Sequence, residues 1–134
     1  MGIIEELKHS FKKGDSIIKL IYINAAVFVV VNLVKVLAVF TQSGFYSPIM
    51  EQLMMPAHTW TFLTRPWTIF SYMFLHEGFL HILFNLLWLY WIGMILVDFM
   101  GSKRVTVVYL LGGISGALLY IVAYNLIPLF NPTA

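Results

Sequence analysis

Residues 79–97 read FLHILFNLLWLYWIGMILV, an apolar run interrupted by the strongly polar side chains of His81 and Asn85. Its length is close to the roughly 20 apolar residues that an α-helix needs to cross a bilayer. His81 and Asn85 are four residues apart, so they share one face of a helix. Polar and ionisable groups are costly inside a membrane and are candidate functional groups there. The run therefore predicts a spanning helix that carries a functional pair near its start.

The composition of the whole chain indicates a membrane protein. Of its 134 residues, 60% are hydrophobic and only 10% are charged, whereas soluble domains carry about 25% charged residues. The length corresponds to one small domain. The net charge of +2 is too small to indicate a nucleic-acid partner. The absence of cysteine excludes disulfides, zinc–thiolate sites and thiol catalysis.

Two further runs, 17–40 and 105–127, have the length and composition of spanning helices. Asn24 and Asn32 interrupt the first run, and we expect them to form hydrogen bonds between helices. Residues 98–104 are expected to form a tight polar turn. The prediction is thus an all-α polytopic membrane protein with three transmembrane helices in one domain, residues 1–134.

The remaining segments are expected to lie at the membrane boundary. Residues 1–16 are mixed in charge and predict a short amphipathic helix. A membrane-surface helix and a solvated helical tail fit this pattern equally well. Residues 41–77 are broken by turn residues but rich in Met, Trp and Phe, which favours a structured outer loop in the interface.

Basic residues predict the orientation of the chain in the membrane. They are concentrated before the first span and in the 98–104 turn, whereas the 41–77 loop contains only Arg65. The positive-inside rule then places the N-terminus and the turn in the cytoplasm. The outer loop and the C-terminal end face outward, and His81 and Asn85 lie near the outer end of their helix, within reach of water.

A catalytic triad of Ser115, His81 and Asp98 is disfavoured by helix geometry. His81 and Asp98 would be about 25 Å apart along one helix axis, beyond hydrogen-bond reach. Ser115 and His81 would differ in depth by about 10 Å. Ser115 is instead expected to be a small packing residue between Gly112 and Gly116, whose spacing lets another helix approach closely.

The histidines do not predict a metal site. His76 and His81 are five residues apart, His58 is distant, and Glu77 is the nearby carboxylate, so the number of ligands is too small. No metal and no organic cofactor is expected. The His81/Asn85 face can donate hydrogen bonds into a cavity between helices, which suits an oxyanion formed during acyl transfer. A purely structural His–Asn contact remains an alternative on periodicity alone.

Residues 65–85, RPWTIFSYMFLHEGFLHILFN, resemble the entry into the second transmembrane helix of rhomboid intramembrane serine proteases. The similarity extends over residues 17–134. The resemblance implies a six-helix core with a Ser–His dyad, the serine lying in a G-x-S-G motif at the start of the fourth helix. It also implies that His81 and Asn85 stabilise the oxyanion and that His76 shapes the preceding loop.

Two features depart from the family pattern. Its Trp-Arg element would fall on Trp67 and the next residue, but that residue is Thr68, and Arg65 lies before the tryptophan. Family spacing would place the nucleophilic serine shortly after Ala134. The chain is therefore expected to correspond to the N-terminal half of a rhomboid, without nucleophile or base, and to meet the missing half or to self-associate.

The expected function is a rhomboid-type serine endopeptidase that cleaves transmembrane substrates. The expected location is a bacterial cytoplasmic membrane, with the N-terminus in the cytoplasm. One alternative is a rhomboid-like pseudoprotease that binds transmembrane segments without cutting them. Another is an unrelated three-helix subunit of a membrane assembly such as a transporter.

Overall fold

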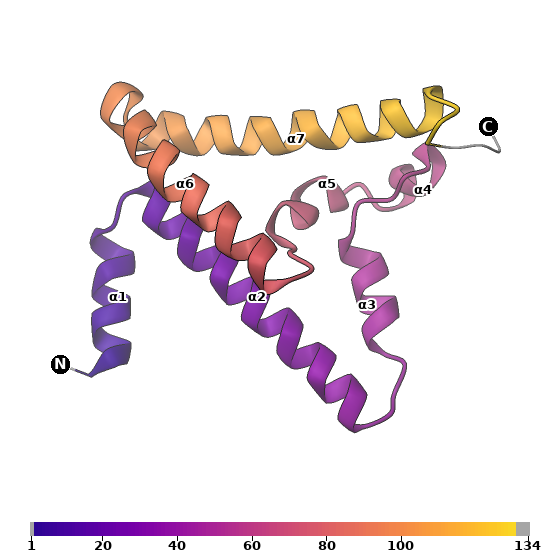
Figure 1. Ribbon diagram of the computed structural model, residues 1–134, viewed down its shortest axis with the longest axis horizontal. Helices are drawn as coiled ribbons and strands as arrows, with labels where there is room; N and C mark the ends of the chain where they lie inside the picture. The colour runs from indigo at the N-terminus through magenta and orange to yellow at the C-terminus, as the bar shows by residue number, and fades with distance from the viewer. Residues whose placement is uncertain (1, 131–134) are drawn as a thin grey trace. The chain divides into compact units, whose positions relative to one another are not determined.

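The structure is a computed structural model that describes residues 2–130, so residue 1 and residues 131–134 of the expected domain lie outside it (Figure 1). It is built from helices, and no strand occurs between residues 2 and 130. The all-α prediction is thus confirmed. The elements in chain order are α1 (Ile3–Lys13), α2 (Ser16–Phe40), α3 (Tyr46–Leu53), α4 (Thr59–Thr64), α5 (Thr68–Ser71), the 3-10 helix η1 (Tyr72–Phe74), α6 (Phe79–Met100) and α7 (Ser102–Leu126).

Three helices, α2, α6 and α7, are long and apolar enough to cross a membrane. At most 17% of the most apolar 18-residue window of each helix is buried. Large contiguous apolar surfaces of this kind are unusual on soluble monomers. These helices therefore require lipid or further helices around them, in agreement with the predicted polytopic membrane protein.

The turn between α6 and α7 is tighter than the sequence suggested. α6 continues to Met100 and α7 starts at Ser102, so Gly101 alone separates them. Gly101 has φ 83° and ψ 155°, a conformation essentially restricted to glycine. Its N–H donates to the carbonyl of Val97 at 2.8 Å and closes the last turn of α6. The polar residues of the expected 98–104 turn therefore belong to the two helix ends.

The chain forms two compact units, residues 1–30 with 76–109, and residues 31–75 with the part from 110 onward. In the first unit, the side chains of Ile17 and Leu20 from α2 and Val105 from α7 form a buried core. Half-buried side chains pack against this core, most of them from α6: Ile21, Leu89, Met94, Leu96, Val97, Met100 and Tyr109.

Close packing in the first unit depends on Gly93 of α6. A Cβ atom at this position would lie 2.5 Å from Cδ1 of Ile17, which is completely buried. A glycine at this point lets the two helix backbones approach closely.

Polar contacts also join the helices of the first unit. The backbone N–H of Ser16 donates to Oγ of Ser102 at 2.8 Å, and the two hydroxyl oxygens are 2.5 Å apart. Asn24, which is 2% exposed, donates from Nδ2 to the carbonyl of Leu20 and to the hydroxyl of Tyr109. The predicted hydrogen bonding of Asn24 between helices is confirmed. These contacts hold the start of α7 beside the first half of α2.

In the second unit, the C-terminal end of α3 is capped by side chains from further along the outer loop. Arg65 donates from Nη1 to the carbonyl of Glu51, and Trp67 donates from Nε1 to the carbonyl of Gln52, both at 2.7 Å. The hydroxyl of Ser71 donates to the next carbonyl, that of Leu53, at 2.6 Å. Carbonyls at a helix end lack partners within the helix, and three successive ones find them here.

The outer loop also contacts α7 within the second unit. Asn125 donates from Nδ2 to the carbonyl of Ala57 at 2.9 Å, and the ring of His58 meets that of Tyr124 edge-on, with ring centroids 5.5 Å apart. Residues 41–77 therefore form a folded connection built from short helices.

Close approach to the glycine-rich part of α7 occurs at Gly113. The hydroxyl of Tyr72 donates to the carbonyl of Gly113, and a Cβ added there would lie 2.4 Å from Sδ of Met73. Gly112, which the sequence pattern had singled out, has no atom within 4 Å of such a Cβ. The element that approaches this part of α7 is η1 rather than a long helix, because the outer loop turns back toward α7.

Candidate functional site

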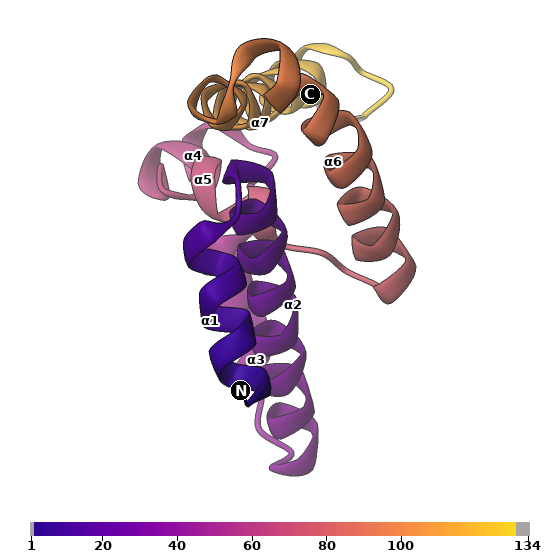
Figure 2. The ribbon, with the colours of Figure 1, turned by 90° about the vertical axis from the view of Figure 1, so that its left-hand side faces the viewer.

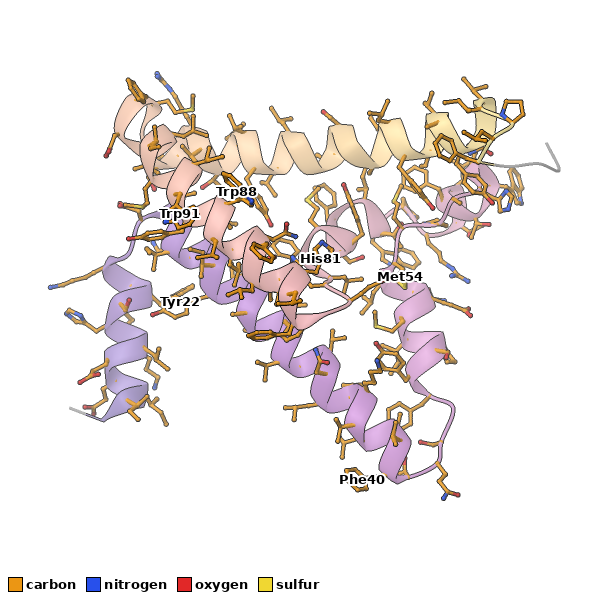
Figure 3. All side chains as sticks on the ribbon, viewed as in Figure 1. Tyr22, Phe40, Met54, His81, Trp88 and Trp91 are labelled. Atoms are coloured by element: carbon orange, nitrogen blue, oxygen red, sulfur yellow. The ribbon has the colours of Figure 1, made fainter. Side chains whose placement is uncertain are left out.

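The candidate site lies at the start of α6. Gly78 precedes the helix in an extended conformation, and His81 and Asn85 are its third and seventh residues. Four residues of α-helix rise about 6 Å, so the two side chains lie on one face, about one turn apart. Both residues are exposed, and Figure 3 shows His81 near the start of α6.

His76 contacts the ring of His81. The two ring centroids are 5.3 Å apart and the rings meet edge to face at 66°. Residues five apart on one helix lie on different faces, which would separate His76 from His81 if both were helical. That argument does not apply, since His76 lies in the connection between η1 and α6 and not on the helix. The exposed His81 imidazole therefore has a second imidazole beside it at the start of α6.

Asn85 has no hydrogen-bond partner for its side-chain amide among residues 2–130. Its two N–H donors and its carbonyl oxygen therefore remain available to a ligand. The donors of Asn85 and of the His81 imidazole project from neighbouring turns of one helix. Such an arrangement can bind an oxygen atom that develops negative charge.

Other ionisable side chains do not gather around this pair into a metal site. Within the described chain, no group of three His, Cys, Asp or Glu side chains is arranged to hold a metal ion. Asp98 lies 17 residues beyond His81 on the same helix, about 25 Å along its axis. A hydrogen bond between His81 and Asp98 is therefore ruled out by the helix itself.

Ser115 is exposed on α7 and belongs to the second unit, whereas His81 belongs to the first. The expectation that Ser115 packs against a neighbouring helix is not met among the described residues. Gly113 makes the closest contact instead, and a Cβ added at Gly116 would lie 3.3 Å from the hydroxyl oxygen of Tyr72.

Structural contacts within the outer loop involve Arg65, Trp67 and Thr68, the positions compared above with a Trp-Arg element. Arg65 and Trp67 both donate to the end of α3. Thr68 is completely buried, and its hydroxyl donates to the carbonyl of Arg65 at 2.7 Å and toward Sδ of Met55 at 3.7 Å. Sequence reasoning missed this role of Thr68, because a threonine within an apolar stretch gives no signal of a long-range partner.

The helices and the polar pair together define a polytopic all-α membrane protein with a candidate binding site at the start of a spanning helix. Comparison with protein families matches the rhomboid domain at residues 63–130, just over half of the chain. The chain therefore belongs to the rhomboid family. No curated protein and no solved structure matches it. The matched range includes His81 and Asn85 and extends from α4 through α7.

Proposed function

We propose that the protein acts as an intramembrane serine endopeptidase on transmembrane substrates, with His81 and Asn85 as oxyanion-stabilising residues. The observation that carries this proposal is the exposed His81/Asn85 face, with a free amide on Asn85, at the start of a spanning helix inside the rhomboid domain.

The proposed chemistry requires donors aimed at one oxygen atom. When a serine hydroxyl attacks a peptide carbonyl, the serine proton passes to a base and the carbonyl oxygen takes up the negative charge. An imidazole N–H of His81 and the Nδ2–H of Asn85 would donate to that oxygen. In this proposal, none of the 134 residues is assigned the role of nucleophile or base.

His76 is proposed to act as a positioning residue. Its edge contact with the His81 ring limits the rotation of the imidazole, and a fixed donor costs less reorganisation when charge develops. Replacing His76 would therefore lower the rate by misorienting His81 and would leave substrate binding largely unchanged.

The proposed orientation puts the N-terminus in the cytoplasm. Lys19 follows Ser16, and Lys103 and Arg104 follow Ser102, so the hydrogen bond between the two serines gathers these three cations at one end of the first unit. The positive-inside rule favours the cytoplasmic side for that end. The start of α6, with His81, then faces the outer side.

The test uses the product of the whole reading frame, reconstituted in liposomes with a transmembrane substrate. His81→Ala and Asn85→Ala are each expected to lower kcat by about 10²–10³-fold, the usual effect of losing one oxyanion donor, while KM changes little. His58→Ala, which makes the same chemical change in the outer loop, serves as the control and should retain activity.

Other outcomes of this assay separate the alternatives. Full activity in both site variants would refute the role of the pair. Substrate binding without any cleavage by the unmodified protein would identify a non-cleaving rhomboid-like protein instead.

A second measurement concerns Ser115. We expect no covalent labelling of the 134-residue chain by a fluorophosphonate, because Ser115 lacks a base in this proposal. Labelling that disappears in Ser115→Ala would identify Ser115 as a reactive serine and overturn this expectation.

A further inference from the structure

An exposed apolar surface runs along α1, and we call it the α1 stripe: Ile3, Ile4, Leu7 and Phe11. These side chains are 77%, 69%, 49% and 41% exposed, in chain order. Exposure thus decreases toward the end of α1 that joins α2. The stripe is left uncovered by the rest of the described chain over most of its length.

The rest of the α1 surface is polar. At 100° per residue, the four apolar residues fall within about a third of the helix circumference, and the charged residues occupy the rest of it, with Lys8 beside the stripe. Glu5 and Glu6 lie in the first turn, and Lys12 and Lys13 lie in the last. This division is typical of helices that lie in the plane of a membrane interface.

The connection to α2 holds α1 close to the membrane. Only Gly14 and Asp15 separate α1 from α2, a helix apolar enough to span a bilayer. Two extended residues reach about 7 Å. Figure 1 and Figure 2 both show the C-terminal end of α1 close to the first turns of α2, so the α1 stripe is tethered near the start of that helix.

Tyr22 of α2 contacts the C-terminal end of α1. Its ring lies 6.2 Å from that of Phe11, and its hydroxyl donates to that of Ser10 at 3.1 Å (Figure 3). Tyrosine favours the boundary between headgroups and acyl chains, because its ring is apolar and its hydroxyl polar. The contact therefore puts the C-terminal end of the α1 stripe at that boundary.

Basic side chains surround the same end of the unit. Lys12 and Lys13 end α1, Lys19 lies in the first turn of α2, and Lys103 and Arg104 start α7, which is hydrogen-bonded to α2 through the two serines. The acidic residues closest in sequence to these basic residues are Asp15 and Asp98. Cations near an anionic lipid surface strengthen membrane binding.

A second copy of the chain is a poorer occupant of the α1 stripe than lipid. The 11 residues of α1 form a helix about 16 Å long. An apolar strip about 10 Å wide on it would offer roughly 160 Å², against about 800 Å² per partner in stable protein interfaces. The strip is large enough for one helix to rest on a bilayer to which it is already tethered.

We infer that α1 lies on the bilayer surface, with the α1 stripe at the boundary between headgroups and acyl chains and with Lys8, Lys12 and Lys13 contacting anionic headgroups. This inference does not depend on the proposed peptidase activity, and it resolves the choice between a surface helix and a solvated tail that the sequence left open. Its partner is an anionic lipid bilayer.

The test uses the absence of cysteine from the chain, which makes single-cysteine labelling direct. Leu7→Cys on the α1 stripe and His9→Cys on the opposite face each carry a nitroxide spin label, in the full chain reconstituted in nanodiscs of phosphatidylcholine with phosphatidylglycerol. We expect the label at position 7 to be accessible to oxygen, which concentrates in lipid, and shielded from a water-soluble nickel chelate. The label at position 9 should show the reverse.

A second arm tests the charge of the lipid. Nanodiscs without phosphatidylglycerol, or the triple variant Lys8→Gln, Lys12→Gln and Lys13→Gln, should shift the label at position 7 toward water. Each lysine is expected to change the surface-bound equilibrium about fivefold.

Three results would overturn the inference. Equal exposure of both labels to the nickel chelate would show a solvated tail. Shielding of position 7 from both reagents would show a protein contact. An unchanged depth without phosphatidylglycerol and in the triple variant would remove the role of anionic lipid.

Discussion

Replacing Gly93 by alanine tests the packing of α2 against α6 at its closest point. The new Cβ would lie 2.5 Å from Cδ1 and 2.9 Å from Cγ1 of Ile17, whereas ordinary contacts begin at 3.4 Å. Ile17 is completely buried in the first unit, so its side chain has no solvent to swing into. The helices must separate, or Ile17 must leave its rotamer.

The expected loss of stability follows from two opposing effects. Overpacking a close contact costs about 1–3 kcal/mol, while alanine gains up to about 1 kcal/mol over glycine in helix propensity. We therefore expect Gly93→Ala to be about 1–3 kcal/mol less stable than a glycine-to-alanine change without a clash, and about 0–2 kcal/mol less stable than the unmodified protein. Ile17→Ala removes Cδ1, Cγ1 and Cγ2, the last of which would lie 3.3 Å from the new Cβ. Alone, it costs about 2–5 kcal/mol through the cavity it leaves.

The two substitutions should not be additive. In the double variant, the alanine at position 93 extends into the space vacated by Ile17, so the combined loss should fall short of the sum by about 1–2 kcal/mol. Unfolding in mixed micelles can be followed by the fluorescence of Trp88 and Trp91, which lie on α6 (Figure 3).

Gly112→Ala is the matched control for this experiment. It makes the same substitution in α7, where an added Cβ meets no atom within 4 Å. If Gly93→Ala were as stable as this control and showed no coupling to Ile17→Ala, the close contact between α2 and α6 would be refuted.

Four further substitutions probe other contacts. Gly101→Ala should destabilise the protein by about 1–3 kcal/mol in the same unfolding assay, since alanine disfavours φ 83° and ψ 155°; wild-type stability would contradict that turn. Asn24→Ala should cost about 0.6–1.7 kcal/mol through its lost hydrogen bonds, and Tyr109→Phe, which removes one of them, should cost less. Trp67→Phe keeps an aromatic ring but loses the donor to the carbonyl of Gln52, so limited proteolysis of the outer loop should become faster, by a factor corresponding to about 1 kcal/mol.

The sequence predicted the features that depend on local composition. The three spanning helices follow from long apolar runs, and the family from the motif that contains His81 and Asn85; both predictions are confirmed. The hydrogen bonding of Asn24 between helices was also predictable, because a buried amide in an apolar helix needs a partner. The oxyanion role of His81 and Asn85 stays a prediction.

The features that the sequence did not predict depend on contacts between distant residues. Predicting the contact of His76 with His81 requires knowing that α6 begins at Phe79. Sequence periodicity alone does not define the first residue of a helix. The capping of α3 by Arg65, Trp67 and Ser71 joins side chains to carbonyls 14–18 residues earlier. No spacing rule relates such positions, because the intervening loop sets the distance.

The hydrogen bond between Ser16 and Ser102 has a consequence for how the protein meets bilayers of different thickness. It ties the first residues of two 25-residue spanning helices to a common level. A helix adapts to hydrophobic mismatch by tilting or by shifting its ends relative to the lipid. Because the first residues of α2 and α7 are held together, we expect the two helices to adapt to a thinner or thicker membrane at their opposite ends, next to Phe40 and Leu126. The outer loop starts at the first of these ends, so we expect membrane thickness to affect the segment that leads into the candidate site.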